Sequence, residues 1–143
     1  MKDPNDSIGY LLMQIGKQRR TMSNALLNQQ KLHSGQDLML YYLSEEDGQT
    51  ASQLADKLSV KPATITNMVD RMAAEGLLER RKGTIDKRTA RVFLTTKGHT
   101  VFASIDKAWE DVEDKTTKGL SIIEKFMLKR LLYQVYTNYR KII

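Results

Sequence analysis

Cysteine is absent from the 143 residues, and proline occurs only twice. Without a thiol, the chain has no disulfide scaffold, no thiolate zinc site, no cysteine nucleophile and no thiol redox sensor. It also lacks a glycine-rich phosphate loop, a nucleophile elbow and a histidine–carboxylate metal spacing. We therefore predict that the protein is not an enzyme and uses no cofactor or metal.

Long apolar runs are also missing. No stretch approaches the roughly 20 apolar residues that a membrane span needs. The first ten residues show no basic segment followed by an apolar one, so no secretory signal is visible. Together with the absence of cysteine, these features lead us to expect a soluble, cytoplasmic protein without a membrane partner.

Positive charge is concentrated in one short segment. The net charge is +6 and 41% of the residues are hydrophobic, as expected for a single globular domain. Residues 77–98 hold seven basic and two acidic side chains, a net charge of +5, whereas residues 1–76 have a net charge of −1. Because a solvated surface spreads its charges, this concentration indicates an element that binds a polyanion.

Apolar periodicity predicts a mainly α-helical fold with a small two- or three-stranded β wing. The expected order is two helices, a short helix, a further helix, the ribbon over about 78–95, and two final helices. Pro62 suits the start of the fourth helix, and Gly76 its end. Three capping boxes support these boundaries: Ser34 with Asp37, Thr50 with Gln53, and Ser121 with Glu124.

The two helices within about 50–75 form a helix-turn-helix candidate, although helix pairs of this kind are common. The outer face of the second helix carries small hydroxyl and amide groups, which can approach base edges in the major groove. Exposed helices built for solubility usually carry Glu and Lys instead. The residues predicted on this face to contact DNA are Lys61, Thr64, Thr66, Asn67 and Arg71.

A basic hairpin follows directly. Cations packed this closely repel one another, so the cluster is understandable if phosphates neutralise it. An arginine at a thin hairpin tip can also enter the narrow minor groove. The cations predicted to contact DNA here are Arg80, Arg81, Lys82, Lys87, Arg88 and Arg91.

The stretch from Asp86-Lys87-Arg88 to Val92-Phe93-Leu94-Thr95 and Gly98 resembles the wing signature of the MarR family, Asp-x-Arg followed by Val-x-Leu-Thr and a glycine. The resemblance covers essentially the whole chain. The segments that also resemble this family are Leu32-His33-Ser34-Gly35-Gln36, Gln53-Leu54-Ala55, Thr64 to Met72, and Glu75 to Arg80.

The resemblance implies a winged helix-turn-helix regulator that binds pseudo-palindromic double-stranded DNA as a homodimer, commonly as a repressor released by a ligand. By motif match, Arg88 is the minor-groove arginine, and Asp86 orients it or holds the tip. The reactive N-terminal cysteine of peroxide-sensing members is absent. Only His33 and His99 could act as imidazole ligands, which argues against a zinc-sensing site of several histidines.

We predict one domain over 1–143, with a DNA-binding region over about 34–98 and dimerisation helices over about 4–30 and 99–143. A small winged-helix core cannot cover the apolar stripes of both terminal helices, so a second copy is expected to bury them. The predicted dimer residues are Ile8, Leu11, Leu12, Ile15, Leu128, Leu132, Val135, Tyr139, Ile142 and Ile143.

A small-molecule effector is expected between the dimer helices and the DNA-reading regions, where it would change their spacing. The predicted wall is partly apolar and suits a small amphipathic or aromatic anion: Leu12, Ile15, His33, Tyr42 and Arg71. A filled core with control by protein abundance alone is the alternative to this pocket. For the whole protein, the alternative function is a winged-helix module that binds protein or structured RNA.

Overall fold

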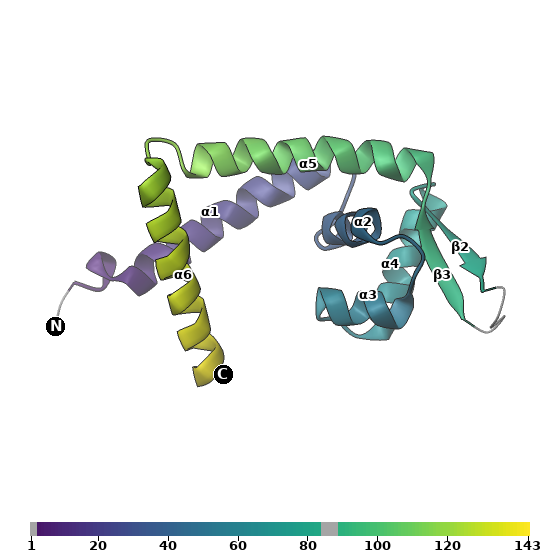
Figure 1. Cartoon of the computed structure of the whole chain (residues 1–143), viewed down its shortest axis with the longest axis horizontal. Helices are drawn as coiled ribbons and strands as arrows, with labels where there is room; N and C mark the ends of the chain where they lie inside the picture. Colours follow the sequence, from purple (N-terminus) through teal and green to yellow (C-terminus); the bar gives the residue numbers. More distant parts are fainter. Residues whose placement is uncertain (1–2, 84–88) are drawn as a thin grey trace. The chain divides into compact units, whose positions relative to one another are not determined.

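The computed structural model describes residues 3–83 and 89–143. The chain divides into two compact units, Met1–Lys107 and Ala108–Ile143, and the boundary falls within helix α5 (Thr96–Thr116). Figure 1 shows the elements in sequence colours.

The first unit begins with a 3₁₀ turn, η1 (Pro4–Asp6), and the long helix α1 (Ile8–Gln29). Ser7 caps α1, because its Oγ accepts a hydrogen bond from the Tyr10 N–H at 3.1 Å. Most apolar side chains of α1 remain exposed, and Leu27 near its end is the residue that becomes buried.

Three short helices follow: α2 (Gln36–Glu45), α3 (Ala51–Leu58) and α4 (Pro62–Ala74). The predicted Ser34 capping box is wrong. Gly35 is the N-cap at φ +90°, a left-handed conformation, and it makes no side-chain cap. The buried Gln36 instead takes the role expected of the Asp37 carboxylate, since its Oε1 accepts a hydrogen bond from the backbone N–H of His33, which precedes the helix, at 2.9 Å.

The sheet has three antiparallel strands in the order β1–β3–β2. Of the two- and three-stranded wings that the sequence allowed, the structure therefore has the three-stranded one. They are β1 (Gln49–Thr50), β2 (Leu78–Lys82) and β3 (Ala90–Leu94). In the register, Arg80 lies opposite Val92 and Arg81 opposite Arg91. Val92 and Leu94 are buried on one face, as their alternation predicts.

The core of the first unit closes around α2, α3, α4 and the sheet. Met39, Leu40, Leu43, Leu54 and Ile65 are fully buried there. The capping residue Thr95 joins α5 to this core: its Oγ1 accepts from the Gly98 N–H and donates to the Gly76 carbonyl at 2.6 Å. The fold is the predicted mainly α-helical class with a small β wing.

The second unit contains the last part of α5 and the helix α6 (Ile122–Ile142). Gly119, at φ +86°, lies between them. The Ser121–Glu124 capping box is present in full. No residue of α6 is buried, although the helix carries apolar side chains along its whole length. Over the described part of the chain, no helix has the length and apolar character needed to cross a membrane.

Candidate nucleic-acid interface

The turn between α3 and α4 is built by local backbone signals. Thr50 and Gln53 form the predicted capping box at the start of α3. Ser59 ends that helix in the left-handed region, at φ 55°, and Pro62 starts α4 at its first position. These signals join the two helices through only three residues, which is the predicted helix-turn-helix.

Helix α4 separates an inner from an outer face. Ile65, Val69 and Met72 are 0–1% exposed and hold the helix in the core. All five predicted DNA-contacting residues of this segment, Lys61, Thr64, Thr66, Asn67 and Arg71, lie on its exposed side. The helix therefore presents polar side chains to solvent along its N-terminal half, where free N–H groups also favour phosphate.

Thr66 differs from its neighbours on this face. Its hydroxyl donates a hydrogen bond to the Pro62 carbonyl, one turn earlier, at 3.2 Å. In this rotamer the hydroxyl retains acceptor capacity but no free donor. Thr64 and Asn67, three positions apart on the same face of the helix, are exposed and remain available for base edges.

The wing lies immediately after α4, and three of its arginines already have partners in the chain. Arg80 forms an ion pair with Asp70, Arg81 with Glu79, and Arg91 donates to the Gly48 carbonyl at 2.9 Å. Sequence reasoning treated these cations as mutually repelling and unpaired. Their partners come from β2 itself, from α4 and from the α2–β1 corner, which sequence spacing does not reveal.

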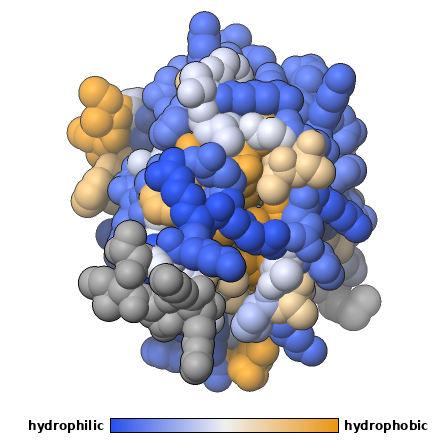
Figure 2. All heavy atoms as spheres, turned by 90° about the vertical axis from the view of Figure 1, so that its right-hand side faces the viewer, coloured by the Kyte–Doolittle hydropathy of each residue, from blue (hydrophilic) through white to orange (hydrophobic). Residues whose placement is uncertain are grey.

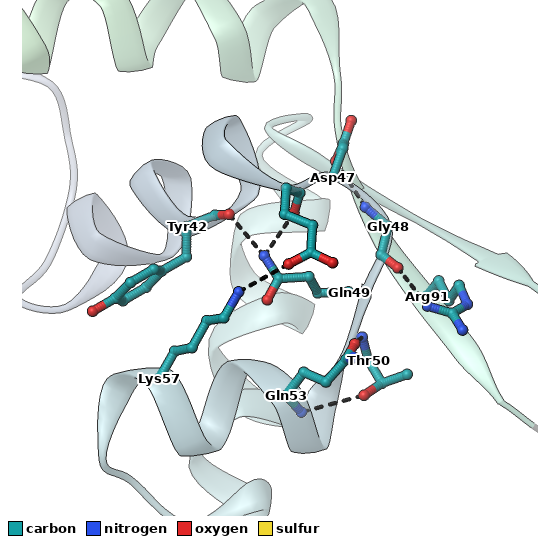
Figure 3. Close-up of polar contacts among 9 residues, drawn as sticks. Tyr42, Asp47, Gly48, Gln49, Thr50, Gln53, Lys57 and Arg91 are labelled. Atoms are coloured by element: carbon teal, nitrogen blue, oxygen red, sulfur yellow. Dashed lines mark hydrogen bonds and ion pairs between the residues drawn. The ribbon is translucent and has the colours of Figure 1, made fainter.

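The α2–β1 corner holds the base of the wing, as Figure 3 shows. Gly48, at φ +72°, lies so close to Phe93 that an added Cβ would be 2.8 Å from the ring. The Asp47 carboxylate accepts from the Leu94 N–H at 3.0 Å. The buried Gln49 Nε2 donates to the carbonyls of Tyr42 and Glu46. Sequence analysis missed these residues, which fix the wing to the helices.

Lys82 is exposed at the end of β2. Asp86, Lys87 and Arg88, which carry the minor-groove prediction, lie outside the described residues. The side of the molecule in Figure 2 is mostly hydrophilic, with smaller apolar areas between the polar side chains.

A cavity of about 260 Å³ lies between the N-terminal end of α2 and the outer face of α4. It brings together two of the five predicted effector residues, His33 and Arg71. Leu12, Ile15 and Tyr42 are not among the lining residues; Tyr42 instead contacts the Tyr41 ring at 5.3 Å between centroids. The complete lining is His33, Ser34, Gln36, Thr64, Asn67, Met68 and Arg71.

The predicted dimer residues are exposed or half-buried within the single chain. On α1, Ile8, Leu11 and Ile15 are exposed and Leu12 is half-buried. On α6 and after it, Val135 is half-buried, and the exposed ones are Leu128, Leu132, Tyr139, Ile142 and Ile143. An apolar groove of about 640 Å³ in the second unit is lined by Leu128 and Leu132 together with Phe126, Tyr133 and Tyr136, which were not among the predicted dimer residues.

Comparison with known proteins gives consistent results. Residues 32–90 match the model of the MarR family. The HTH-type transcriptional regulator YsmB of Bacillus subtilis is 30% identical over 109 residues, covering 73% of this chain and 75% of that protein.

Solved structures share the fold. A complex of S. aureus MepR with DNA superposes with a TM-score of 0.79 at 21% identity, covering 96% of this chain and 99% of that one. The Streptomyces coelicolor regulator PcaV, solved with its natural ligand, gives a TM-score of 0.76 at 20% identity, covering 96% of each chain.

Proposed function

The chain belongs to the MarR family of transcriptional regulators, and from this premise we propose that it represses transcription by binding a specific double-stranded DNA operator as a homodimer. The observation that carries the proposal is the polar outer face of α4, which is followed directly by a basic ribbon. Helix and ribbon together suit the major groove and the adjacent backbone or minor groove.

Discrimination between sequences is assigned to α4. Thr64 and Asn67 are exposed, carry hydrogen-bonding groups and sit in the first half of the helix. Lys61 and Arg71 lie at either end of this surface and suit phosphates. The alternative, a module that binds structured RNA, is disfavoured because the major groove of A-form RNA is too deep and narrow for side chains to read.

Selection from a random duplex library tests this function. We expect a pseudo-palindrome whose half-sites are about 34 Å apart, one turn of DNA. Asn67→Ala is expected to relax discrimination by roughly 1–3 kcal/mol for the lost base contact. Asn24→Ala, which removes an exposed amide from α1, is the matched control and should select the wild-type motif.

An unchanged motif for Asn67→Ala and Thr64→Ala would remove α4 from the major groove. Competition by an RNA duplex of the same sequence at equal concentration would favour the alternative function.

Release of the operator is assigned to a small anionic effector. The cavity on α4 offers the His33 imidazole and the Arg71 guanidinium beside the Met68 side chain. Its volume of about 260 Å³ fits one small aromatic acid. Because Thr64, Asn67 and Arg71 belong both to this cavity and to the predicted DNA surface, a ligand bound there competes with the operator.

A thermal-shift screen of aromatic acids tests the effector. By linkage, a true effector stabilises the free protein and weakens operator binding to a matching extent. Replacing Arg71 by Gln should remove the thermal shift. A compound that raises the melting temperature without changing operator affinity does not act at this site.

A further inference from the structure

Arg80 of β2 reaches across to the outer side of α4 and contacts it at two points. Its Nη1 lies 2.6 Å from Oδ1 of Asp70, and its Nη2 lies 3.4 Å from the Thr66 carbonyl oxygen. Both acceptors belong to the central turns of α4, the helix whose exposed face carries Thr64 and Asn67. One guanidinium therefore connects the wing to the helix assigned to the major groove.

This placement differs from that of a cation awaiting a phosphate. A carboxylate already neutralises the Arg80 charge, and the fork geometry of guanidinium suits two acceptors at once. Lys82, two residues further along the same strand, is exposed, and its ammonium group makes no hydrogen bond or ion pair with any residue in 3–83 or 89–143. The strand thus offers one cation committed to α4 and one available for DNA.

Stability does not account for the Arg80–Asp70 pair. The side chains are 40% and 54% exposed, and ion pairs in such positions contribute little to the free energy of unfolding. What the pair restricts is geometry, because both contacts must break before the middle of β2 can move away from α4.

We propose that Arg80 is a positioning residue that sets the angle between wing and α4 through Asp70 and Thr66, and that it thereby contributes to operator discrimination without binding a phosphate. The inference rests on the proposed DNA-binding function. Two linked binding elements gain from simultaneous engagement only when their geometry lets both reach their sites. We call the contacts of Arg80 with Asp70 and Thr66 the brace. Loss of the brace should weaken binding to the operator, where wing and α4 must both fit, more than binding to unrelated DNA.

The test measures affinity for the selected operator and for an unrelated duplex over a range of salt concentrations, using Arg80→Gln, Asp70→Asn and the double variant. Each single change should lower the operator preference about fivefold or more, and the double variant should lose no more than either single one, because both remove the same contact. The slope of log affinity against log salt should stay at the wild-type value for Arg80→Gln.

Two further variants make the result specific. Lys82→Gln is the matched control for a phosphate contact. Its affinity for both duplexes should fall together, and the slope of log affinity against log salt should become less steep by about 0.9. Arg80→Lys keeps the charge but cannot span both acceptors, so it should lose part of the operator preference with an unchanged slope.

The brace is overturned if Arg80→Gln lowers the salt slope as Lys82→Gln does, or if Asp70→Asn tightens binding by removing a carboxylate near the DNA. It is also overturned if the effects of Arg80→Gln and Asp70→Asn on operator preference simply add. A wild-type protein that prefers no duplex over unrelated DNA would instead overturn the proposed function, and the brace with it.

Discussion

The two units of the chain use their apolar side chains in opposite ways. Among the described residues, fifteen of the sixteen buried hydrophobic side chains belong to Met1–Lys107, and Val112 alone belongs to Ala108–Ile143. Yet α6 is rich in Leu, Ile, Phe and Tyr, and every one of its side chains is exposed or half-buried. Apolar side chains of the first unit outside α1 therefore close a core, whereas those of α6 remain open to solvent.

The difference teaches where the protein needs a second copy. A long apolar helix surface that the chain's own core leaves uncovered requires cover from another molecule. The groove along α6, with Leu128, Leu132 and Tyr136 in its lining, offers an apolar surface of the kind that obligate interfaces bury. We therefore propose that the terminal helices form the dimer interface and that the core around α2–α4 carries the DNA-binding surface.

Charging the α6 surface should have the largest effect on function. Replacing Leu128 and Leu132 together by Glu places two carboxylates in the proposed interface, so we expect a monomer in light scattering. Operator affinity should fall by about 100-fold or more, because a monomer loses the gain from binding two half-sites at once. The core around α2–α4 should remain folded, since neither side chain belongs to it.

The control for this double change lies on the opposite side of the same helix. Arg130→Glu with Gln134→Glu also adds two carboxylates to α6, at exposed positions away from Leu128 and Leu132. That variant should stay dimeric. If Leu128→Glu/Leu132→Glu also remains a dimer with wild-type affinity, the interface lies elsewhere.

The space around Gly98 in the first unit and Gly119 in the second shows how tightly each unit is packed at these positions. A Cβ on Gly98 would lie 2.2 Å from the carbonyl oxygen of Leu77, a backbone atom that cannot rotate away. Gly98→Ala should therefore lower the free energy of unfolding by about 3 kcal/mol, as overpacking does. Gly119 has open space around its Cβ position, and only its φ of +86° opposes a side chain. Gly119→Ala should cost about 1 kcal/mol.

Urea denaturation of the two variants measures this difference. Equal losses would mean that the contact between the Leu77 carbonyl and Gly98 can relax, and that the core of the first unit is less tightly determined than its burial indicates.

Sequence alone predicted the parts of the fold whose signals are local. Thr50 with Gln53, Ser121 with Glu124, Pro62 and Gly76 act within one helical turn, and all are found where the pattern placed them. The Ser34 box failed because Gly35 adopts a left-handed conformation and Gln36 supplies the acceptor instead. A residue pattern does not specify which of several polar side chains turns back onto the backbone.

The candidate site depends more on contacts between distant residues. Arg91 and Gly48 are 43 positions apart in the chain, and Arg80 meets Asp70 only because β2 lies against α4. The sequence therefore predicted a basic wing but could not show that Arg80 and Arg91 are paired with residues distant in the chain. Likewise, His33 and Arg71 share a cavity while Leu12 and Ile15 lie on α1, a distinction that needs the tertiary structure.

The two capping boxes differ in one side chain, and only the box of α6 contains a group that titrates. Loss of either box should have the smallest effect on stability, and that effect should depend on pH in α6 alone. In α6, the Glu124 carboxylate accepts a hydrogen bond from the Ser121 N–H at 2.7 Å. This backbone hydrogen bond is the main reason that the pKa of Glu124 lies below its ordinary value, and a hydrogen bond with the Ser121 side chain lowers the pKa further. In α3, the neutral Gln53 amide occupies the same position.

A carboxyl whose pKa is lower in the folded state stabilises the protein while it is ionised. The Glu124 contribution should therefore be complete above the ordinary glutamate pKa of about 4.3 and should disappear as the pH falls from there through the lowered folded value. Thermal melts of wild type and Glu124→Gln between about pH 7 and pH 3 measure it by difference, which cancels the other carboxyls. We expect the wild type to be the more stable protein at neutral pH, and the difference in stability between it and Glu124→Gln to narrow in acid.

The matched variant Gln53→Glu should acquire the same pH dependence in α3. A gap between wild type and Glu124→Gln that is constant across the range would show that the carboxylate form is not preferred in the folded helix, and that the α6 cap depends on the Ser121 hydroxyl alone.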